Sequence, residues 1–468
     1  MRVKVLLPLP LDGPLDYLAP DDWQLRRGSL VVVPLGPRRL TGAVWMVEAR
    51  PSPTEFDAAK LKNVEAQLDL PALPESLTDL VDWLASYSVT APGLVLRLVL
   101  RSSQALEAPI MRTAYIPTGH APQRLTPARR RVLALLEDQL PRTAPEIAEA
   151  AGVSPGVIKG LAEQGALERV RRPVDLPFDT PDPAAGGVTL SPSQRRAADA
   201  LVQRTTAQSF SVTLLNGVPG SGKTETYFEA IAAALQCQRQ VLVLLPEIAL
   251  TVPFLDRFAA RFGCRPAVWH SEMSAKERRR TWRGVATGKV RALVGARSAL
   301  FLPFSDLGLI VVDEEHDSAF KQEDGVIYHA RDIAVVRASL ANIPAILSSA
   351  TPSLETVVNV DQGRYHQEHL VERHGGAHLP TIEAVDMRCD GPEPGNWLSP
   401  RVVRSVKDTL QRDEQALLFL NRRGYAPLTL CRSCGHRMRA PDTSSWLVEH
   451  RFSNRLICHH SGFSMAKP

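Results

Sequence analysis

Apolar and polar residues alternate along the middle of the chain in a pattern that predicts a layered α/β domain. Residues 210–216 (FSVTLLN), 307–312 (LGLIVV) and 343–347 (IPAIL) are short apolar runs, as expected for strands buried on both faces of a parallel sheet. Residues 225–236 (ETYFEAIAAALQ) follow the first run and have the apolar spacing of an amphipathic helix. We therefore expect a helix-covered sheet, called lobe one, over residues 187–370.

The N-terminal part of the chain has a β-rich pattern instead. Residues 3–7, 29–34 (SLVVVP) and 41–47 (TGAVWMV) have strand composition and are bounded by glycine or proline. Residues 75–87 (ESLTDLVDWLASY) have helical apolar spacing. The pattern predicts a small barrel-like or sandwich module over residues 1–105, closed by one helix.

A helical pattern occupies residues 120–175. It predicts helices at 128–136, 144–151 and 155–164, and a wing strand at 166–170. Ser154 and Pro155 are suited to the N-cap and first turn of the third helix. This order is typical of a winged helix, a module that binds DNA in some proteins and other proteins elsewhere, and both alternatives stay open. A linker rich in proline and glycine, residues 172–187, leads into lobe one.

One short motif gives the strongest chemical signal. It fits the pattern G-x-x-x-x-G-K-[ST], in which backbone N–H groups surround phosphates, the lysine reaches the β and γ oxygens and the hydroxyl binds Mg²⁺. The strand before it and the helix after it supply the context that such a loop requires. The motif predicts an ATP and Mg²⁺ site formed by Gly217, Val218, Pro219, Gly220, Ser221, Gly222, Lys223 and Thr224.

A second motif, Asp313-Glu314-Glu315-His316, follows the apolar run 307–312. Ligands bind at the carboxyl ends of strands in open α/β sheets, so Asp313 is expected to hold Mg²⁺ and Glu314 to orient or deprotonate water. His316 is expected to couple this site to its neighbours. A surface acidic cluster is the alternative, because the motif is weak without the phosphate loop.

Further segments are expected to end at the same edge of the sheet. Ser349-Ala350-Thr351 follows the run 343–347, and its hydroxyls could relay nucleotide state to a DNA groove. Residues 242–251 (LVLLPEIALT) and 294–302 (VGARSALFL) each combine a strand with polar loop residues. These loops could touch a nucleic-acid backbone.

Composition is that of an ordinary folded protein. The 468 residues are 44% hydrophobic and 22% charged, and the net charge of +5 is a small excess of 55 basic over 50 acidic residues. That excess is compatible with polyanion binding without establishing it. No apolar stretch approaches the ~20 residues of a membrane helix, so we expect no membrane partner and a cytoplasmic location. Three cysteines gather near the C-terminus, which favours metal binding over disulfides.

The motifs and their order resemble one known family. The strings LLPLPLD, GVPGSGKTETY, LLPEIALT, VVDEEHDSAFKQED, YHARD, SSATPSLE, FLNRRGY and CRSCGH resemble primosomal protein N′ (PriA), a family of replication-restart helicases of superfamily 2. The resemblance spans essentially the whole chain. It implies a RecA-like P-loop helicase lobe, an N-terminal β-rich DNA-binding domain and a winged-helix domain.

The resemblance also implies a function. The family acts as an ATP-dependent 3′–5′ DNA helicase that recognises stalled or abandoned replication forks, remodels them and promotes primosome assembly. The implied partners are forked and single-stranded DNA, primosome proteins and single-stranded-DNA-binding protein. The implied cofactors are ATP, Mg²⁺ and Zn²⁺.

Roles for single residues follow from the same resemblance. Gln194 matches the family's adenine reader. Phe320 and Tyr328 lie in residues 317–332, which resemble the family's aromatic-rich loop and could stack on bases. The residues that fall where the family captures the 3′-OH end of a nascent strand are Leu15, Asp16, Gly36 and Lys62. Ordinary strand ends are the alternative for this last group.

The C-terminal segment departs from the family, which has four cysteine pairs in two zinc sites. The positions where cysteines of the family are replaced include Ala440, Thr443 and Ser461. Residues 431–468 are therefore expected to be a degenerate, incomplete zinc-binding insertion. Cys431, Cys434 and Cys458, with nearby histidines, could still hold one Zn²⁺.

Residues 385–430 resemble the start of the family's second lobe, with a strand expected at 417–420. The resemblance implies that the rest of that lobe, with an arginine that completes the ATP site, would follow residue 468, as in a C-terminally truncated member. Without that arginine, hydrolysis would fall by on the order of 10³. The alternative function is a fork-DNA-binding adaptor without motor activity, and a nucleotide-gated RNA helicase is a third hypothesis.

Overall fold

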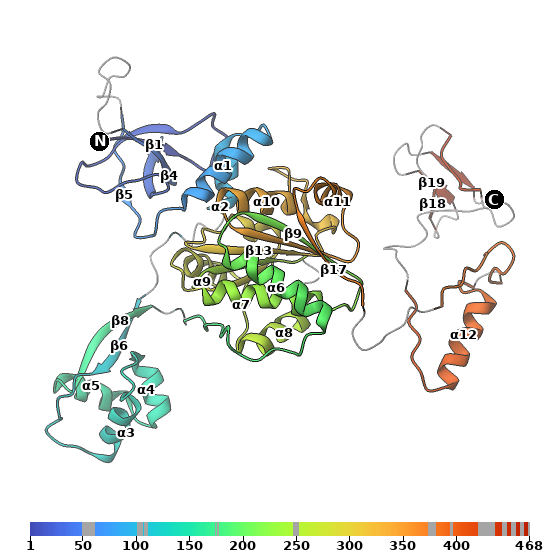
Figure 1. Cartoon of the computed structure of the whole chain (residues 1–468). Coiled ribbons are helices and arrows are strands. Elements are labelled where there is room, and N and C mark those ends of the chain that lie inside the picture. The colour runs from blue at the N-terminus through green and yellow to red at the C-terminus, as the bar shows by residue number, and fades with distance from the viewer. Residues whose placement is uncertain are drawn as a thin grey trace. The chain divides into compact units, whose positions relative to one another are not determined.

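The computed structural model divides into two compact units, Met1–Ala377 and His378–Pro468. The residues described are 1–48, 61–100, 106, 111–173, 175, 177–246, 252–372, 381–393, 396–419, 436–441, 447–450, 455–458 and 463–466. Within these ranges, no helix is both long enough and apolar enough to cross a membrane. Figure 1 shows the elements of each unit.

A seven-stranded sheet forms the centre of the first unit, in the order β11-β12-β10-β13-β16-β9-β17. All neighbouring strands run parallel. Every residue of β10, β13 and β16 is buried, which is why these segments are continuous apolar runs in the sequence. The strands are β9 (Ser211–Gly217), β10 (Gln240–Leu244), β11 (Ala267–Trp269), β12 (Ala292–Gly295), β13 (Leu307–Asp313), β16 (Pro344–Ser349) and β17 (His366–Leu370).

Helices cover both faces of this sheet (Figure 1). They are α6 (Pro192–Thr206), α7 (Lys223–Gln236), α8 (Val252–Phe262), α9 (Ala275–Ala286), α10 (Ala330–Leu340) and α11 (Leu354–Asp361). Val241 and Val243 of β10 pack in one core with α6, α7 and α8, whereas Leu242 and Leu244 pack in the other with α9 and α10. Alternate residues of a strand point to opposite faces, so each strand contributes to both cores. The predicted α/β lobe is confirmed.

The N-terminal module is a five-stranded antiparallel sheet in the order β2-β1-β4-β3-β5. Its elements are β1 (Arg2–Leu6), β2 (Leu15–Leu18), β3 (Leu30–Leu35), β4 (Arg38–Glu48), β5 (Ala66–Gln67), α1 (Glu75–Tyr87) and α2 (Pro92–Val99). The closing helix has the predicted bounds. Leu6 and Leu30 on one face of the sheet join α1 and α2 in the same core cluster as Trp282 and Ile333 of lobe one. The module and lobe one therefore share a core.

One hydrogen bond marks the junction of module and lobe. Trp282 of α9 is 1% exposed, and its Nε1 donates to the main-chain oxygen of Val99, at the end of α2, at 3.1 Å. A buried carbonyl oxygen that loses its hydrogen-bond donor destabilises the fold, because water does not reach it to replace the bond. This bond consequently fixes both the position of α2 on α9 and the burial of the indole ring.

The winged-helix segment has its own small core. Its elements are β6 (Met111–Pro117), α3 (Pro127–Leu135), β7 (Arg142–Thr143), α4 (Ala144–Ala151), α5 (Pro155–Glu163) and β8 (Leu167–Pro173). Gly152 ends α4 with φ +60°, and Ser154 and Pro155 stand at the N-cap and first position of α5, as predicted. β8 is the wing strand and pairs with β6, a strand that the sequence pattern did not indicate.

The second unit contains α12 (Pro400–Gln411), β18 (Val448–His450), β19 (Arg455–Ile457) and β20 (Ser464–Ala466). The strand predicted at 417–420 is wrong for its described part. Residues 417–419 have no regular structure, and Leu417 and Phe419 are 91% and 82% exposed. A strand needs a paired neighbour, and apolar composition alone does not supply one.

We predict that Trp282→Phe lowers the free energy of unfolding of the first unit by about 1–3 kcal/mol, because the buried oxygen of Val99 loses its donor. Trp45→Phe is the matched control, since the Trp45 indole donates to Asp82 at an exposed position. Thermal unfolding of the purified variants measures the difference. Equal melting temperatures for the two variants would show that this bond does not stabilise the junction.

Candidate nucleotide and nucleic-acid site

The phosphate loop joins β9 to α7. Gly220 and Gly222 have φ of +78° and +81°, the left-handed region that glycine adopts without strain. Lys223 opens α7, and its Nζ donates to the main-chain oxygen of Gly217 at 2.9 Å. Within the described part of the chain, Ser221 Oγ is buried without a hydrogen-bond partner. A helix N-terminus with an unpaired buried hydroxyl and a lysine fits a phosphate group.

Gln194 supports this loop from α6. Its side chain is buried, its Nε2 donates to the main-chain oxygen of Ser221 at 2.8 Å, and its Oε1 accepts from the amide of Ser191 at 2.8 Å. The second bond belongs to the capping box of α6. The amide thus holds the loop in place, and its role as adenine reader stays a prediction.

Asp313 ends β13 and is 8% exposed. Its Oδ2 accepts from the hydroxyl of Tyr227 at 2.9 Å, and its Oδ1 accepts from the hydroxyl of Ser348 at 2.7 Å. The neighbouring strand β16 supplies Ser348, and α7 supplies the tyrosine. Two elements therefore fix the orientation of this carboxylate at the carboxyl edge of the sheet.

Tyr227 and Ser348 are two site residues that sequence reasoning missed, and Tyr227 comes from α7. Tyr227 is completely buried, and its hydroxyl contacts both Asp313 and the side chain of Thr224. Burial raises the pKa of Tyr227 well above its ordinary value, and the charge of Asp313 raises it further, so the phenol stays a donor. The helical spacing of Tyr227 from Lys223 was a signal that could have placed it on the same face of α7.

Glu314 has an unusual backbone for a residue with a side chain. Its φ is +50°, in the left-handed region. Burial raises the pKa of its carboxyl, the charge of Asp313 raises it further, and Lys223 and His316 oppose that rise. The phosphate loop and the acidic motif, far apart in sequence, are thus brought within electrostatic range of each other.

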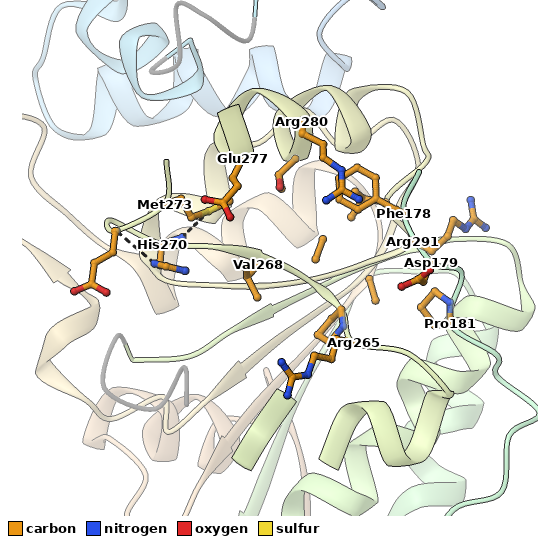
Figure 2. Close-up of a pocket in the computed structure, with 16 residues that line it drawn as sticks. Phe178, Asp179, Pro181, Arg265, Val268, His270, Met273, Glu277, Arg280 and Arg291 are labelled. Atoms are coloured by element: carbon orange, nitrogen blue, oxygen red, sulfur yellow. Dashed lines mark hydrogen bonds between the residues drawn. The ribbon is translucent and has the colours of Figure 1, made fainter. Parts of the chain in front are cut away.

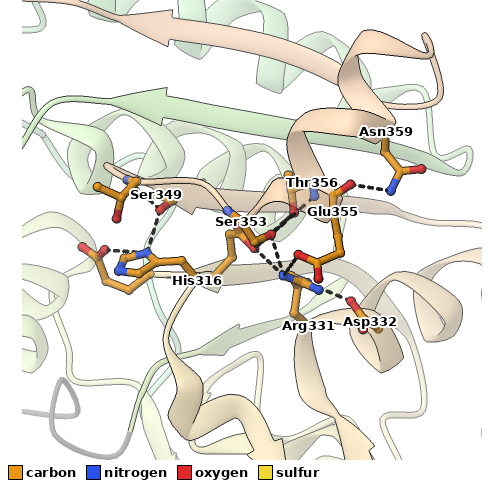
Figure 3. A network of polar contacts seen from close by, with 11 residues as sticks. His316, Arg331, Asp332, Ser349, Ser353, Glu355, Thr356 and Asn359 are labelled. Carbon is orange, nitrogen blue, oxygen red and sulfur yellow. Dashed lines mark hydrogen bonds and ion pairs between the residues drawn. The ribbon is translucent and has the colours of Figure 1, made fainter.

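His316 links the acidic motif to the Ser-Ala-Thr motif (Figure 3). Its Nδ1 lies 2.7 Å from Ser349 Oγ and 3.7 Å from Glu314 Oε2. Ser349 Oγ also accepts from the amide of Thr351 at 3.1 Å. A change in the position of Glu314 can therefore alter the contact between His316 and Ser349 at the end of β16.

The predicted base-stacking rings are buried in this structure. Phe320 is 0% exposed and Tyr328 is 5% exposed, and the Tyr328 ring packs edge-on against Phe301 at 5.2 Å between centroids. Both rings belong to the core beside α10 in this conformation, and their role in stacking on bases stays a prediction. The exposed side chains of this loop are instead those of Ser318, Ala319, Lys321, Glu323, Asp324, Ile327 and Asp332.

A polar cleft of about 430 Å³ lies at the carboxyl ends of β10, β11 and β12. Arg297, from the predicted segment 294–302, donates to the main-chain oxygens of Ala319 and Lys321 at 3.0 and 2.7 Å. It thereby ties the loop after β13 to the wall of the cleft. The lining residues are Leu245, Pro246, Trp269, His270, Ser271, Arg278, Ala296, Arg297, Ser298, Ala319, Phe320, Gln322 and Asp324. Residues 247–251 of the other predicted contact segment lie outside the described residues.

A second cavity, of about 340 Å³, runs along the edge strand β11 (Figure 2). Phe178 lies beneath the guanidinium of Arg280, 4.1 Å from the ring centroid, and His270 accepts from the amide of Glu272. None of the residues predicted to bind nucleotide or DNA lines this cavity. It is therefore separate from the phosphate-loop site.

The residues expected to hold a 3′ end come from three segments. Leu15 and Asp16 are in β2, and Asp16 Oδ1 accepts from Arg2 Nε at 2.9 Å. The amide of Leu18 donates to the main-chain oxygen of Lys62 at 2.9 Å, which brings that lysine's segment beside β2. Gly36 lies in the turn between β3 and β4 with φ +59° and open space around it.

Two parts of the chain match known domain families. Residues 4–101 match the family described as the 3′DNA-binding domain (3′BD), and residues 191–360 match the DEAD/DEAH box helicase family. Three curated proteins called Replication restart protein PriA are similar throughout. The identity is 38% for Rickettsia felis, over 99% of this chain and 60% of that protein. It is 31% for Bacillus subtilis, over 98% and 66%, and 34% for Haemophilus influenzae, over 100% and 64%.

The chain belongs to the PriA family. It spans 60% of the length of the Rickettsia felis relative. The DEAD/DEAH helicase domain implies that this part of the PriA-family chain uses a nucleotide and Mg²⁺. The fold expected from the resemblance, a RecA-like lobe beside a β-rich module, is confirmed.

Zinc ligation is not visible in the described residues of this PriA-family chain. Cys431 and Cys434 lie outside them. Cys458 is buried in an apolar cluster with Leu447 and Leu456. Among the described residues, no group of three or more histidine, cysteine, aspartate or glutamate side chains could hold a metal.

We predict that Gly222→Ala disrupts the phosphate loop, because the added Cβ would lie 2.3 Å from Gln194 Nε2. Gly220→Ala is the matched control: its φ is also positive, but the space around it is open. Both variants lose about 1–2 kcal/mol from the left-handed backbone, and only Gly222→Ala loses more. Thermal unfolding without nucleotide measures this difference. Equal losses would show that Gln194 does not support the loop.

Proposed function

We propose that this chain is the nucleotide-binding and DNA-recognition part of an ATP-dependent 3′–5′ DNA helicase. The helicase would recognise stalled or abandoned replication forks, remodel them and promote primosome assembly. The observation that carries the proposal is the convergence of Lys223, Asp313 and Glu314 at one edge of the parallel sheet. Membership of the PriA family supports the same reading.

The residues at this edge have separate proposed roles in ATP hydrolysis. The phosphate loop binds the β and γ phosphates with its amides and with Lys223, once that lysine releases the oxygen of Gly217. Thr224 and Asp313 are the ligands proposed for Mg²⁺, which neutralises charge on the phosphates. The hydroxyl of Tyr227 contacts both ligands and holds them in register.

Glu314 is the residue proposed to orient the attacking water and accept its proton. A base must be ionised to act, and the raised pKa of Glu314 makes it a stronger proton acceptor than an ordinary glutamate. His316 then connects this step with Ser349. Movement of β16 relative to β13 would change the contact between His316 and Ser349.

The cleft at the ends of β10, β11 and β12 is proposed to bind a DNA strand. Arg278 and Arg297 give it positive charge, and Ser298 and Gln322 give it neutral hydrogen-bonding groups. Such groups suit a phosphate backbone, which carries most of the affinity in nucleic-acid complexes. Because the rings of Phe320 and Tyr328 are buried, base stacking in this loop would require a different conformation.

The N-terminal module is proposed to recognise the 3′ end of a nascent strand. Asp16 can accept a hydrogen bond from the terminal hydroxyl, and Lys62 can pair with the adjacent phosphate. The open space beside Gly36 allows the sugar to approach the backbone. The further expectations, primosome proteins, single-stranded-DNA-binding protein, a cytoplasmic location and Zn²⁺ at the cysteines, stay predictions.

We predict that forked DNA with a free 3′ end stimulates ATP hydrolysis by this chain and that Lys223→Ala abolishes turnover. The reason is that the lysine is proposed to contact the β and γ phosphates directly. Steady-state release of phosphate, with and without the fork, measures this. Lys289→Ala, an exposed lysine outside the loop, is the control and should retain the wild-type rate.

The two leading hypotheses differ in this experiment. Stimulated turnover that Lys223→Ala removes would support a working motor. Tight fork binding without turnover, unchanged in Lys223→Ala, would contradict the helicase proposal for this chain and favour an adaptor that only binds forks. Equal affinity for RNA and DNA forks would favour the third hypothesis, an RNA helicase.

We also predict that the chain binds a fork ending in a 3′-hydroxyl about tenfold more tightly than one ending in a 3′-phosphate, since a hydrogen bond to a charged group contributes about 1.5–3 kcal/mol. Asp16→Ala should remove this preference, whereas Asp12→Ala, at an exposed position, should retain it. Fluorescence anisotropy with the two forks measures both affinities. A wild-type chain that binds both forks equally would exclude the 3′-end site.

A further inference from the structure

Glu315 is a completely buried carboxylate next to the proposed catalytic residue Glu314. Its Oε1 accepts from the amide of Ser353 at 2.7 Å. Its Oε2 accepts from Ser353 Oγ at 3.0 Å, from Thr356 Oγ1 at 3.1 Å and from Arg331 Nη1 at 3.2 Å. Burial of an ionised carboxylate is tolerated only with such compensation. The side chain is thereby locked in one position.

Arg331 is the charged partner in this lock (Figure 3). Its side chain is 7% exposed, and it also donates to Ser353 Oγ at 2.5 Å and, through Nε, to Asp332 at 2.8 Å. Glu355, which is 73% exposed, lies 3.9 Å away on the solvent side. The guanidinium therefore joins the start of α10 to the start of α11 through the buried carboxylate.

Glu314 lies between two residues whose side chains are both fixed. Asp313 is held by Tyr227 and Ser348, and Glu315 is held by the network around Arg331. The single residue between them has φ +50°, a backbone conformation that costs a residue with a side chain free energy. Such a conformation persists only where the surroundings determine it. Here the fixed side chains of Asp313 and Glu315, called the two anchors, hold the backbone of Glu314 in this conformation.

The position of Arg331 in the fold connects this lock to more distant parts. It is the second residue of α10, and the loop before this helix contributes Ala319, Phe320, Gln322 and Asp324 to the proposed DNA cleft. Ile333 and Ala334 of the same helix pack in the core shared with α1 and α2 of the N-terminal module. A shift of α10 therefore acts on the guanidinium, and through Glu315 on the backbone of Glu314.

We propose that the buried Glu315–Arg331 pair holds Glu314 in its left-handed backbone conformation, so that Arg331 is a positioning residue for ATP hydrolysis. This inference rests on the proposed function for its kinetic consequence. Its structural part concerns the backbone of residues 313–316 and is independent of turnover. Loss of the pair releases the second anchor and lets Glu314 leave the strained conformation.

The test uses hydrogen exchange in the full 468-residue chain without nucleotide. Arg331→Met removes the donor and keeps the length of the side chain. The double variant Arg331→Met with Glu315→Gln also removes the buried unpaired charge, so it remains informative if the single variant does not fold. In either variant, the amides of Glu314 and Glu315 should exchange about tenfold or more faster than in the wild type. In the control variant Glu355→Gln, which changes only the exposed contact, the same two amides should exchange at the wild-type rate.

Kinetics supply a second readout. Arg331→Met should lower kcat for fork-stimulated hydrolysis by about 10- to 100-fold, since small displacements of catalytic groups have effects of that size. The KM for ATP should stay near the wild-type value, because no phosphate contact is removed. Arg331→Lys, which keeps the charge, should recover part of the rate. A merely structural role would lower stability without this split between kcat and KM.

Unchanged exchange at residues 313–316 in a folded pair-breaking variant would overturn the inference. So would a wild-type kcat in Arg331→Met. A wild-type chain that does not hydrolyse ATP would contradict the proposed function instead, and the exchange measurement would still decide the positioning role. The two failures are therefore distinguishable.

Discussion

The arrangement of the site depends on the need to satisfy buried carboxylates at the end of β13. Asp313 is 8% exposed and Glu315 is 0% exposed, and neither position tolerates an unpaired charge. The donors come from α7, β16, α10 and the start of α11. Because these elements must all meet at one strand end, the phosphate loop, the acidic motif and the Ser-Ala-Thr motif are held in a fixed relation to one another.

The core that the N-terminal module shares with lobe one connects this arrangement to the rest of the first unit. Leu6 and Leu77 of the N-terminal module belong to the same apolar cluster as Trp282 and Ile333 of lobe one. The module proposed to recognise a 3′ end is therefore packed directly against the lobe proposed to hydrolyse ATP. A flexible tether would have allowed binding without communication, whereas packed side chains transmit displacement because interiors are dense.

Local patterns were sufficient for most of the fold. The buried strands of the sheet were evident as apolar runs, α1 has the bounds that its helical spacing indicated, and Gly152, Ser154 and Pro155 marked the turn between α4 and α5. The exceptions are informative. β6 was missed because its residues, MRTAYIP, do not alternate regularly between apolar and polar positions. Residues 417–419 are apolar without a strand partner among the described residues.

The sequence by itself determined the chemistry that is available, because glycines with positive φ, a lysine at a helix start and carboxylates after a buried strand are local features. Only the tertiary structure decided which side chains meet. It showed the hydroxyl of Tyr227 on Asp313, placed Gln194 under the phosphate loop and buried the rings of Phe320 and Tyr328. Such contacts join residues that are distant in the chain. No local sequence pattern encodes which hydrogen-bond donors a buried group will meet or which side chains will fill the space around it.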